Sequence, residues 1–275
     1  MSEKHIQNIK EAADYICGIK NTKPKVGVIL GSGLGAFIDS VENKTIIGYI
    51  NIPHFHQTTV EGHEGRLILG EVAGVQVAVM QGRFHSYEGL TMDEVVFPTR
   101  VLAMLGIDYL ILTNAAGGIN LKYTQGDLVN ITDHINLMGK NPLVGPNLSQ
   151  LGPRFPDMTQ AYNIELQEIF KAAAKEINYN MPEGVYVGVL GPTYETPAEI
   201  KMFRGIGGDM VGMSTVPETI AANHLGLRVG GISCITNMAA GIQHEKLKHE
   251  DIKNQALKVM ERFSAILVKS IAKLK

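Results

Sequence analysis

The chain of 275 residues has only two cysteines, no tryptophan and no excess of charge of either sign. Cys17 and Cys234 lie far apart and form no CxxC pair, which argues against a zinc site or a dithiol redox function. The formal net charge is −2 and no basic stripe is present, which argues against nucleic-acid binding. The absence of tryptophan excludes no class of protein.

The sequence also lacks any apolar run long enough to span a membrane, and its first ten residues, MSEKHIQNIK, are polar. We therefore expect no signal peptide, no membrane contact and a cytoplasmic location in which both thiols stay reduced. Whole-domain repeats and low-complexity stretches are missing, so a single domain over residues 1–275 is the simplest account. With 45% hydrophobic and 19% charged residues, the composition suits a globular protein with a sizeable core.

Segments rich in valine and isoleucine alternate with segments of helical periodicity along the chain. This order predicts an α/β fold whose sheet is covered by helices on both faces. Strands are expected at 25–30, 44–51, 66–72, 75–81, 108–113, 127–132, 185–190, 208–212 and 227–235. Helices are expected at 5–18 and near 92–105, 159–177, 196–204, 216–225 and 250–273. The two strands within 66–82 are separated by Ala73-Gly74, which predicts a hairpin.

Four of the expected strands run directly into small or polar residues. The segments are LILTNAAGG (110–118), YVGVLGPTYE (186–195), GDMVGMST (208–215) and VGGISCITN (229–237). Ligands of α/β sheets bind beyond the carboxyl ends of the strands. Four strands that end alike therefore favour one shared binding site.

Two further segments indicate that this site holds phosphate. VGVILGSGLG (26–35) is an apolar strand that breaks into a glycine turn around Ser32. Exposed backbone N–H groups and the N-terminus of a following helix suit an oxyanion. GRFHSYEG (82–89) presents Arg83, His85 and Tyr87 at alternate positions, and arginine grips phosphate at two points. Together they suggest a small-molecule enzyme that binds phosphate without a metal.

The glycine turn has two other interpretations. GSGLGA (31–36) also fits the dinucleotide pattern G-x-G-x-x-G/A, which an NAD-type oxidoreductase uses. That pattern expects an acidic residue about twenty positions further on, and NIPHFHQTTV (51–60) contains none. A turn without any ligand is the third interpretation. The missing acid makes phosphate binding the preferred one.

A long proline-containing loop, 141–158, has no core pattern apart from its aromatic residue Phe155. Loops of this length are usually functional or interfacial. Phe155 can either reach into a neighbouring subunit or cover the core of its own chain, and the residues alone leave both open.

Taken together, six segments resemble the trimeric purine nucleoside phosphorylases that prefer 6-oxopurines. They occur in the order VILGSGLG, GRFHSYEG, TNAAGG (113–118), GPTYETPAE (191–199), GMSTVPE (212–218) and ITN (235–237), and the likeness covers nearly the whole chain. The resemblance implies one α/β domain with a central mixed, partly barrel-like sheet flanked by helices, assembled as a homotrimer. It implies reversible phosphorolysis of purine ribo- and deoxyribonucleosides, with phosphate as co-substrate and no cofactor.

The resemblance also assigns roles to residues of this sequence. Phosphate would be bound by Ser32, His63, Arg83, His85, the backbone N–H of Ala115, and Ser214. The nucleoside would be bound by Tyr87, Tyr194, Glu195, Val211, Gly212, Met213, Asn237, His249 and, from the adjacent subunit, Phe155. Glu195, Asn237 and His85 would be catalytic. His249 would face the 5′-hydroxyl, with His244 as the alternative.

These assignments predict a preference for inosine and guanosine. The Glu195 carboxylate accepts a hydrogen bond from the ring N–H of a 6-oxopurine, and Asn237 can donate to the imidazole nitrogen of the leaving base. Adenosine offers an acceptor at the same ring position, which leaves Glu195 poorly paired.

Three alternative functions remain to be distinguished. A phosphorylase for S-methyl-5′-thioadenosine would favour aspartate at position 237 and an apolar residue at 249. A phosphorylase directed at xanthosine is harder to exclude, because small changes near the base could accommodate its 2-oxo group. A non-catalytic nucleoside-binding protein would not need Arg83 and Ser32.

Overall fold

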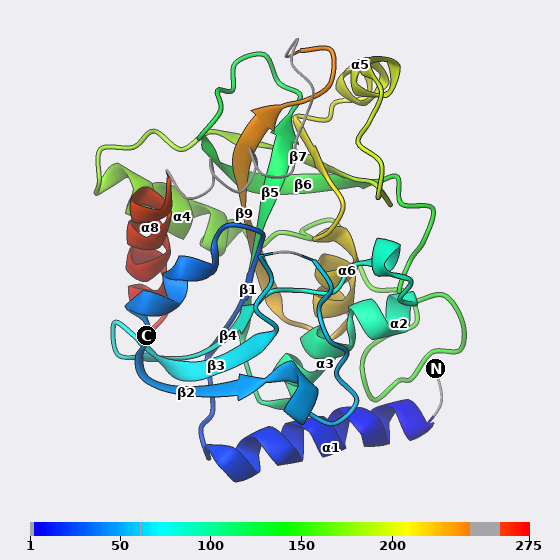
Figure 1. The fold of residues 1–275 in the computed structure, drawn as a ribbon, viewed down its shortest axis with the longest axis vertical. Helices are drawn as coiled ribbons and strands as arrows, with labels where there is room; N and C mark the ends of the chain where they lie inside the picture. Colours follow the sequence, from blue (N-terminus) through cyan, green and yellow to red (C-terminus); the bar gives the residue numbers. More distant parts are fainter. Residues whose placement is uncertain (1–2, 61, 243–258) are drawn as a thin grey trace.

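The computed structural model describes residues 3–60, 62–242 and 259–275. Its strands are β1 (Val26–Leu30), β2 (Glu42–Gly48), β3 (Arg66–Val72), β4 (Val75–Gln81), β5 (Tyr109–Gly118), β6 (Leu128–Asn136), β7 (Glu183–Gly188), β8 (Met210–Gly212) and β9 (Arg228–Met238). They form one mixed sheet in the order β2-β3-β4-β1-β5-β8-β7-β6-β9. Because β5 also pairs with β9, strands β5, β8, β7, β6 and β9 close into a barrel-like ring (Figure 1). The expected partly barrel-like sheet is confirmed.

Helices cover both faces of this sheet. They are α1 (Glu3–Ile19), α2 (Met92–Val95), α3 (Phe97–Met104), α4 (Ile164–Lys175), α5 (Pro197–Gly205), α6 (Val216–His224) and α8 (Met260–Ala272). Helices α1, α3 and α6 pack on one side, whereas α4 and α8 pack together on the other (Figure 1). Alternate residues of β1 face the two cores: Val26 and Val28 lie in the cluster with α4 and α8, and Ile29 lies in the other. This is the burial expected of a strand covered on both sides.

Several element boundaries differ from those expected. The expected helix 92–105 is two helices, because α2 ends at Val95 and α3 starts with Pro98 in its first turn, where a missing N–H is tolerated. The expected helix 159–177 begins only after Asn163, whose Oδ1 accepts a hydrogen bond from the Leu166 N–H. The expected strand 44–51 ends at Gly48. Of the expected last helix, 250–258 lies outside the described residues.

The helix expected after the glycine turn is also different. Residues Gly35–Ser40 form a short 3₁₀ helix, η1, rather than an α-helix. A helix this short has only a small dipole, so the positive potential that we expected from it is weak. An anion bound at this turn would therefore be attracted by side chains and turn N–H groups.

The hairpin and the long loop are confirmed. Strands β3 and β4 pair antiparallel up to Val72 and Val75, with Ala73 and Gly74 both at positive φ, as a two-residue turn requires. Residues 137–163 contain no helix or strand.

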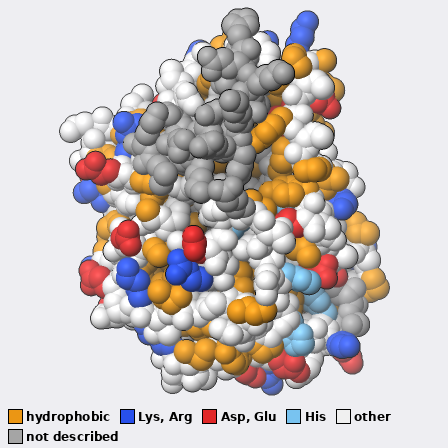
Figure 2. Space-filling view, in the orientation of Figure 1, with side chains coloured by type: hydrophobic (Ala, Val, Ile, Leu, Met, Phe, Trp, Pro, Cys, Tyr) orange, Lys and Arg blue, Asp and Glu red, His pale blue; other side chains and the backbone are white. Residues whose placement is uncertain are grey.

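Among the described residues, no helix is long and apolar enough to cross a bilayer. On the face seen in Figure 2, acidic and basic side chains of the described residues are interspersed, without a continuous basic stripe.

Candidate active site

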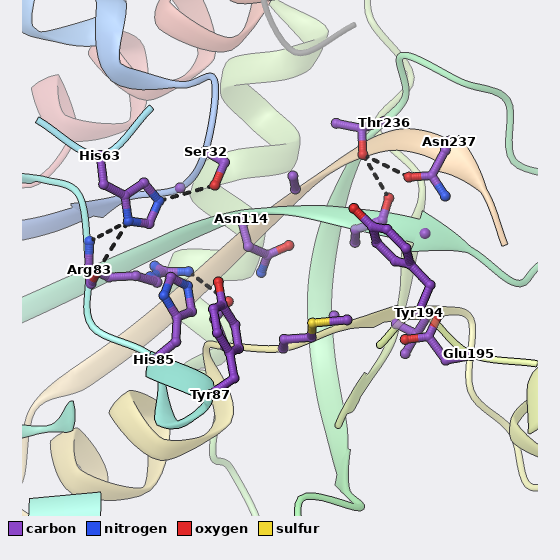
Figure 3. Close-up of a pocket in the computed structure, with 18 residues that line it drawn as sticks. Ser32, His63, Arg83, His85, Tyr87, Asn114, Tyr194, Glu195, Thr236 and Asn237 are labelled. Carbon is purple, nitrogen blue, oxygen red and sulfur yellow. Dashed lines mark hydrogen bonds between the residues drawn. The ribbon is translucent and has the colours of Figure 1, made fainter. Parts of the chain in front are cut away.

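An open cavity of about 730 Å³ lies where several strands end. Strands β4, β1, β5 and β9 are parallel neighbours, so their carboxyl ends lie at the same edge of the sheet. The cavity is lined by the residues after β1 and β4, the second half of β5, and the ends of β8 and β9 (Figure 3). The shared site predicted from the polar strand ends is therefore a real cavity.

The structure brings together all the residues expected to bind phosphate. They are Ser32, His63, Arg83, His85, Ala115 and Ser214, and each lines the cavity. Seven of the nine residues expected to bind the nucleoside also line it: Tyr87, Tyr194, Glu195, Val211, Gly212, Met213 and Asn237.

His63 fixes the hydroxyl in the glycine turn. Its Nε2 lies 3.1 Å from Ser32 Oγ, and its Nδ1 lies 3.2 Å from both the backbone N and the carbonyl O of Arg83. Burial, reinforced by the nearby His85 and Arg83, lowers the pKa of His63 to about 3. The ring is therefore neutral near pH 7, and it ties the β1 turn to the segment after β4.

The guanidinium of Arg83 is fixed by a buried network of polar groups. Its Nη1 donates to Ser214 Oγ at 2.9 Å and to Thr215 Oγ1 at 3.4 Å. Its Nη2 donates to the Ile29 carbonyl at 3.4 Å, and its Nε lies 3.2 Å from Glu218 Oε1. The sequence analysis did not single out Thr215 or Glu218, although both lie in the GMSTVPE segment and Thr215 directly follows Ser214.

His85 is oriented by a carboxylate three residues away. Glu88 Oε1 lies 2.9 Å from both the backbone N and Nδ1 of His85, and Glu88 Oε2 accepts two hydrogen bonds from Thr59. Burial alone would raise the pKa of Glu88, but these hydrogen bonds outweigh it and lower the pKa to about 2. Since the carboxylate is an acceptor only, His85 Nδ1 carries the hydrogen and Nε2 of the neutral ring is an acceptor.

Three rings form a stack along this side of the cavity. The ring centroids of His63 and His85 are 5.3 Å apart, and those of His85 and Tyr87 are 4.6 Å apart. Burial lowers the pKa of His85 in this stack, although Glu88 opposes the shift. Both imidazoles are therefore held flat and uncharged beside Arg83.

The opposite end of the cavity carries a carboxylate and a carboxamide. Glu195 and Tyr194 come from the loop between β7 and α5, and Asn237 comes from the end of β9 (Figure 3). Burial raises the pKa of Glu195. Asn237 is fixed because its Oδ1 accepts from Thr236 Oγ1 at 3.1 Å and its Nδ2 donates to the Met238 carbonyl at 3.2 Å.

Asn114 is a further lining residue that sequence reasoning did not single out. It is 1% exposed, and its Nδ2 donates to Thr215 Oγ1 at 2.9 Å. Thr215 has φ +71, which is unfavourable for a β-branched residue and favours a stabilising partner. The signal was present in the sequence, because Asn114 lies in the TNAAGG segment at the end of β5.

Of the other two expected nucleoside-binding residues, Phe155 lies away from this cavity and His249 cannot be placed. Phe155 is 87% exposed in the loop after β6 and lines a separate surface groove with Arg154 and Pro156. It therefore does not cover its own site or its own core. His249 and its alternative His244 lie outside the described residues.

Comparison with known proteins agrees with this geometry. The family model of the phosphorylase superfamily matches residues 25–272. Purine nucleoside phosphorylase 1 of Bacillus subtilis is 52% identical over 263 residues, covering 96% of this chain and 97% of that protein. Purine nucleoside phosphorylase of Mus musculus is 44% identical over 275 residues, covering 96% and 95%.

Solved structures give the same result. Schistosoma mansoni purine nucleoside phosphorylase in complex with inosine superposes with a TM-score of 0.93 at 41% identity, covering 98% of this chain and 97% of that one. The same schistosomal enzyme in complex with adenosine has a TM-score of 0.94. The extent of these matches shows that the chain belongs to the phosphorylase superfamily and, within it, to the purine nucleoside phosphorylases.

Proposed function

We propose that the cavity catalyses the reversible phosphorolysis of purine ribo- and 2′-deoxyribonucleosides, giving the free base and pentose 1-phosphate. The observation that carries the proposal is the pairing of two chemically different ends in one cavity. Arg83, Ser32 and Ser214 lie at one end, and Glu195 and Asn237 lie at the other (Figure 3). A nucleoside between them would present its anomeric carbon to an anion and its base to a carboxylate.

Phosphate is the nucleophile and attacks the anomeric carbon from the face opposite the base. Arg83 and the two serine hydroxyls orient it, and orientation of two reactants can supply much of a rate enhancement. The Nε2 acceptor of neutral His85 suits the O–H of hydrogen phosphate, since the other groups around the anion are donors. The anion then lies beside the positive charge that develops on the sugar.

The base end favours inosine and guanosine. Their ring N–H can donate to the Glu195 carboxylate, and the second amide hydrogen of Asn237 can donate to the imidazole nitrogen of the purine. Adenosine places an acceptor opposite Glu195, and such a mispaired buried group costs roughly 1–3 kcal/mol. Because a schistosomal relative has been solved with adenosine, this preference is a matter for measurement.

The proposal includes a homotrimer in which Phe155 of one subunit covers the sugar site of the next. Its support is the 87% exposure of Phe155 outside its own cavity. Co-expression of Phe155→Ala with Glu195→Gln tests this directly. Mixed trimers combine an intact pocket with an intact phenylalanine from the neighbour, so they should be more active than either variant alone. Activity equal to the average of the two variants would exclude a shared site.

We also propose that the reaction uses no cofactor, because phosphate itself is the nucleophile and the protein supplies donors for both developing charges. A cytoplasmic location is proposed from the cysteines, since Cys17 and Cys234 are both free thiols.

The test of the function is release of free base from inosine, guanosine, xanthosine, adenosine and S-methyl-5′-thioadenosine, each with and without phosphate. Phosphate-dependent release from inosine and guanosine supports the proposal. Dominant release from xanthosine or the thionucleoside reassigns the substrate, and binding without release identifies a nucleoside-binding protein.

A further inference from the structure

The guanidinium at the phosphate end is already paired with a carboxylate that does not reach the cavity. Arg83 Nε lies 3.2 Å from Glu218 Oε1, and the side chains of both residues are 3% exposed. Neither Glu218 oxygen has a well-aligned hydrogen bond within the part of the chain that the structure describes. Glu218 therefore faces Arg83 as its ion-pair partner, deep in the protein and behind the anion site.

The position of Glu218 on α6 explains why a carboxylate is tolerated there. Thr215 is the N-cap, so Glu218 is the third residue of the helix. The first turn of a helix stabilises negative charge. The carboxylate is thus fixed by the helix on one side and by Arg83 on the other.

The charge of the phosphate end depends on this pair. Arg83 is the single lysine or arginine among the described residues that line the cavity. Burial lowers the pKa of both His63 and His85, so neither ring adds a positive charge near neutral pH. The positive charge that would attract phosphate is therefore balanced before phosphate arrives.

We propose that Glu218 is a positioning residue that holds Arg83 by its Nε edge and, through its charge, weakens the binding of phosphate and of pentose 1-phosphate. The inference rests on the proposed function, since it takes the Arg83 end as the phosphate site. The Nη1 and Nη2 donors face Ser214, Thr215 and the end of β1. An anion beside them is therefore separated from the Glu218 carboxylate only by the guanidinium group of Arg83. Two negative charges that share one buried cation repel each other strongly, because little water screens them.

This role and a merely structural role of Glu218 predict opposite changes in the affinity for phosphate when the charge of Glu218 is removed. A structural ion pair, once removed, loosens Arg83 and weakens anion binding. Glu218→Gln keeps the shape of the side chain and an acceptor oxygen for Arg83 Nε but removes the charge. The guanidinium then stays in place with its full charge available, and phosphate binds more tightly.

The first experiment is calorimetric titration of the full-length protein with inorganic phosphate in the absence of nucleoside. Glu218→Gln should lower the Kd for phosphate at least about tenfold, equivalent to roughly 1.4 kcal/mol. The matched control is Glu94→Gln, which occupies the same third position in α2 but is 40% exposed and does not line the cavity. The control should leave the Kd unchanged. An unchanged or higher Kd in Glu218→Gln overturns the proposal.

Steady-state kinetics provide a second readout. In Glu218→Gln the KM for phosphate should fall while the KM for inosine stays the same, because Glu195 and Asn237 bind the base elsewhere in the cavity. A rise of both constants would indicate general damage and would also overturn the proposal. If the wild-type protein fails to bind phosphate at all, the proposed function is wrong, whatever Glu218 does.

A double variant tests the coupling if Glu218→Gln alone folds poorly. Arg83→Gln leaves the Glu218 carboxylate buried without its partner, which is strongly destabilising. Adding Glu218→Gln to Arg83→Gln should therefore raise the Tm above that of Arg83→Gln alone. A Tm that stays the same or falls would show that the two side chains do not act as a pair, and would refute the inference.

Discussion

Mild acid should destabilise the protein through His63, a residue that also holds Ser32 in the turn after β1. Burial lowers its pKa to about 3 in the folded protein, against an ordinary value of 6.5. The unfolded chain therefore binds the proton at a higher pH than the folded chain does. The stability that neutral His63 contributes is complete above pH 6.5 and is lost as the pH falls from there toward 3.

The size of the loss follows from the same two pKa values. Between them, each pH unit costs up to about 1.4 kcal/mol, so acidification from pH 7 to pH 5 costs about 2 kcal/mol through His63. His85 is also buried with a lowered pKa, so the total loss for the protein is larger. A replacement that cannot titrate isolates the share of His63.

The assay is urea unfolding of the wild type and of His63→Gln at pH 7 and pH 5. Glutamine loses stability of its own, but only the difference between the two pH values is compared. His63→Gln should lose about 2 kcal/mol less on acidification than the wild type does. The control is His56→Gln, which makes the same substitution at a histidine whose side chain is 41% exposed. An equal loss in wild type and His63→Gln would refute the assignment of His63 as a buried neutral ring.

Four further predictions concern the cavity. Glu195→Gln should lower kcat/KM for inosine by roughly one to two decades. Because the active form is the carboxylate and burial raises its pKa, the activity of the wild type should fall in acid, and that of the variant should not. The same fall in the variant would exclude Glu195 as its source. Asn237→Asp removes the donor to the Met238 carbonyl and should raise activity on adenosine relative to inosine, whereas an unchanged ratio argues against the assigned base contacts. Asn114→Ala removes the hydrogen bond to Thr215, so it should lower the free energy of unfolding by roughly 1–3 kcal/mol and raise the KM for phosphate. If thermal unfolding and the KM are both unchanged, Thr215 needs no support from Asn114. Phe155→Ala should raise the KM for inosine without changing the pocket of its own chain, and an unchanged KM would contradict a shared sugar site.

The layers of the fold could be predicted from the sequence because they depend on local patterns. The apolar run at β1 predicts a strand buried on both faces, and Val26, Val28 and Ile29 do lie in two different cores. Ala73-Gly74 predicts a hairpin because it is a two-residue break between two apolar runs, and its glycine adopts positive φ without strain. The break at Val96 was not predicted, although Pro98 indicates it. Proline is excluded from the interior of a helix but tolerated in its first turn, so Pro98 fits only if a new helix begins beside it.

The candidate site was predictable in its lining but not in its supporting contacts. Ser32, Arg83 and Ser214 follow strands whose polar ends are visible in the sequence. Glu218 was not recognisable, because its partner Arg83 is more than a hundred residues away and a glutamate in the first turn of a helix has an adequate local explanation. Contacts between distant segments carry no local pattern, so the electrostatics of the phosphate end required the structure.

The two ends of the cavity meet along β5, and one glycine lets a neighbouring segment approach this strand closely. A Cβ on Gly31 would lie 2.6 Å from the Asn114 Cα, so only glycine lets the β1 turn rest directly on the β5 backbone. That contact brings the turn around Ser32 and the Asn114 side chain to the same cavity. Further along β5, Gly117 pairs with Val211 of β8 and with Asn237 of β9, where the register of the β5–β9 pairing shifts. The same strand thus carries the proposed anion site in its middle and the proposed base site at its end, and closure of the sheet around β5 sets their separation.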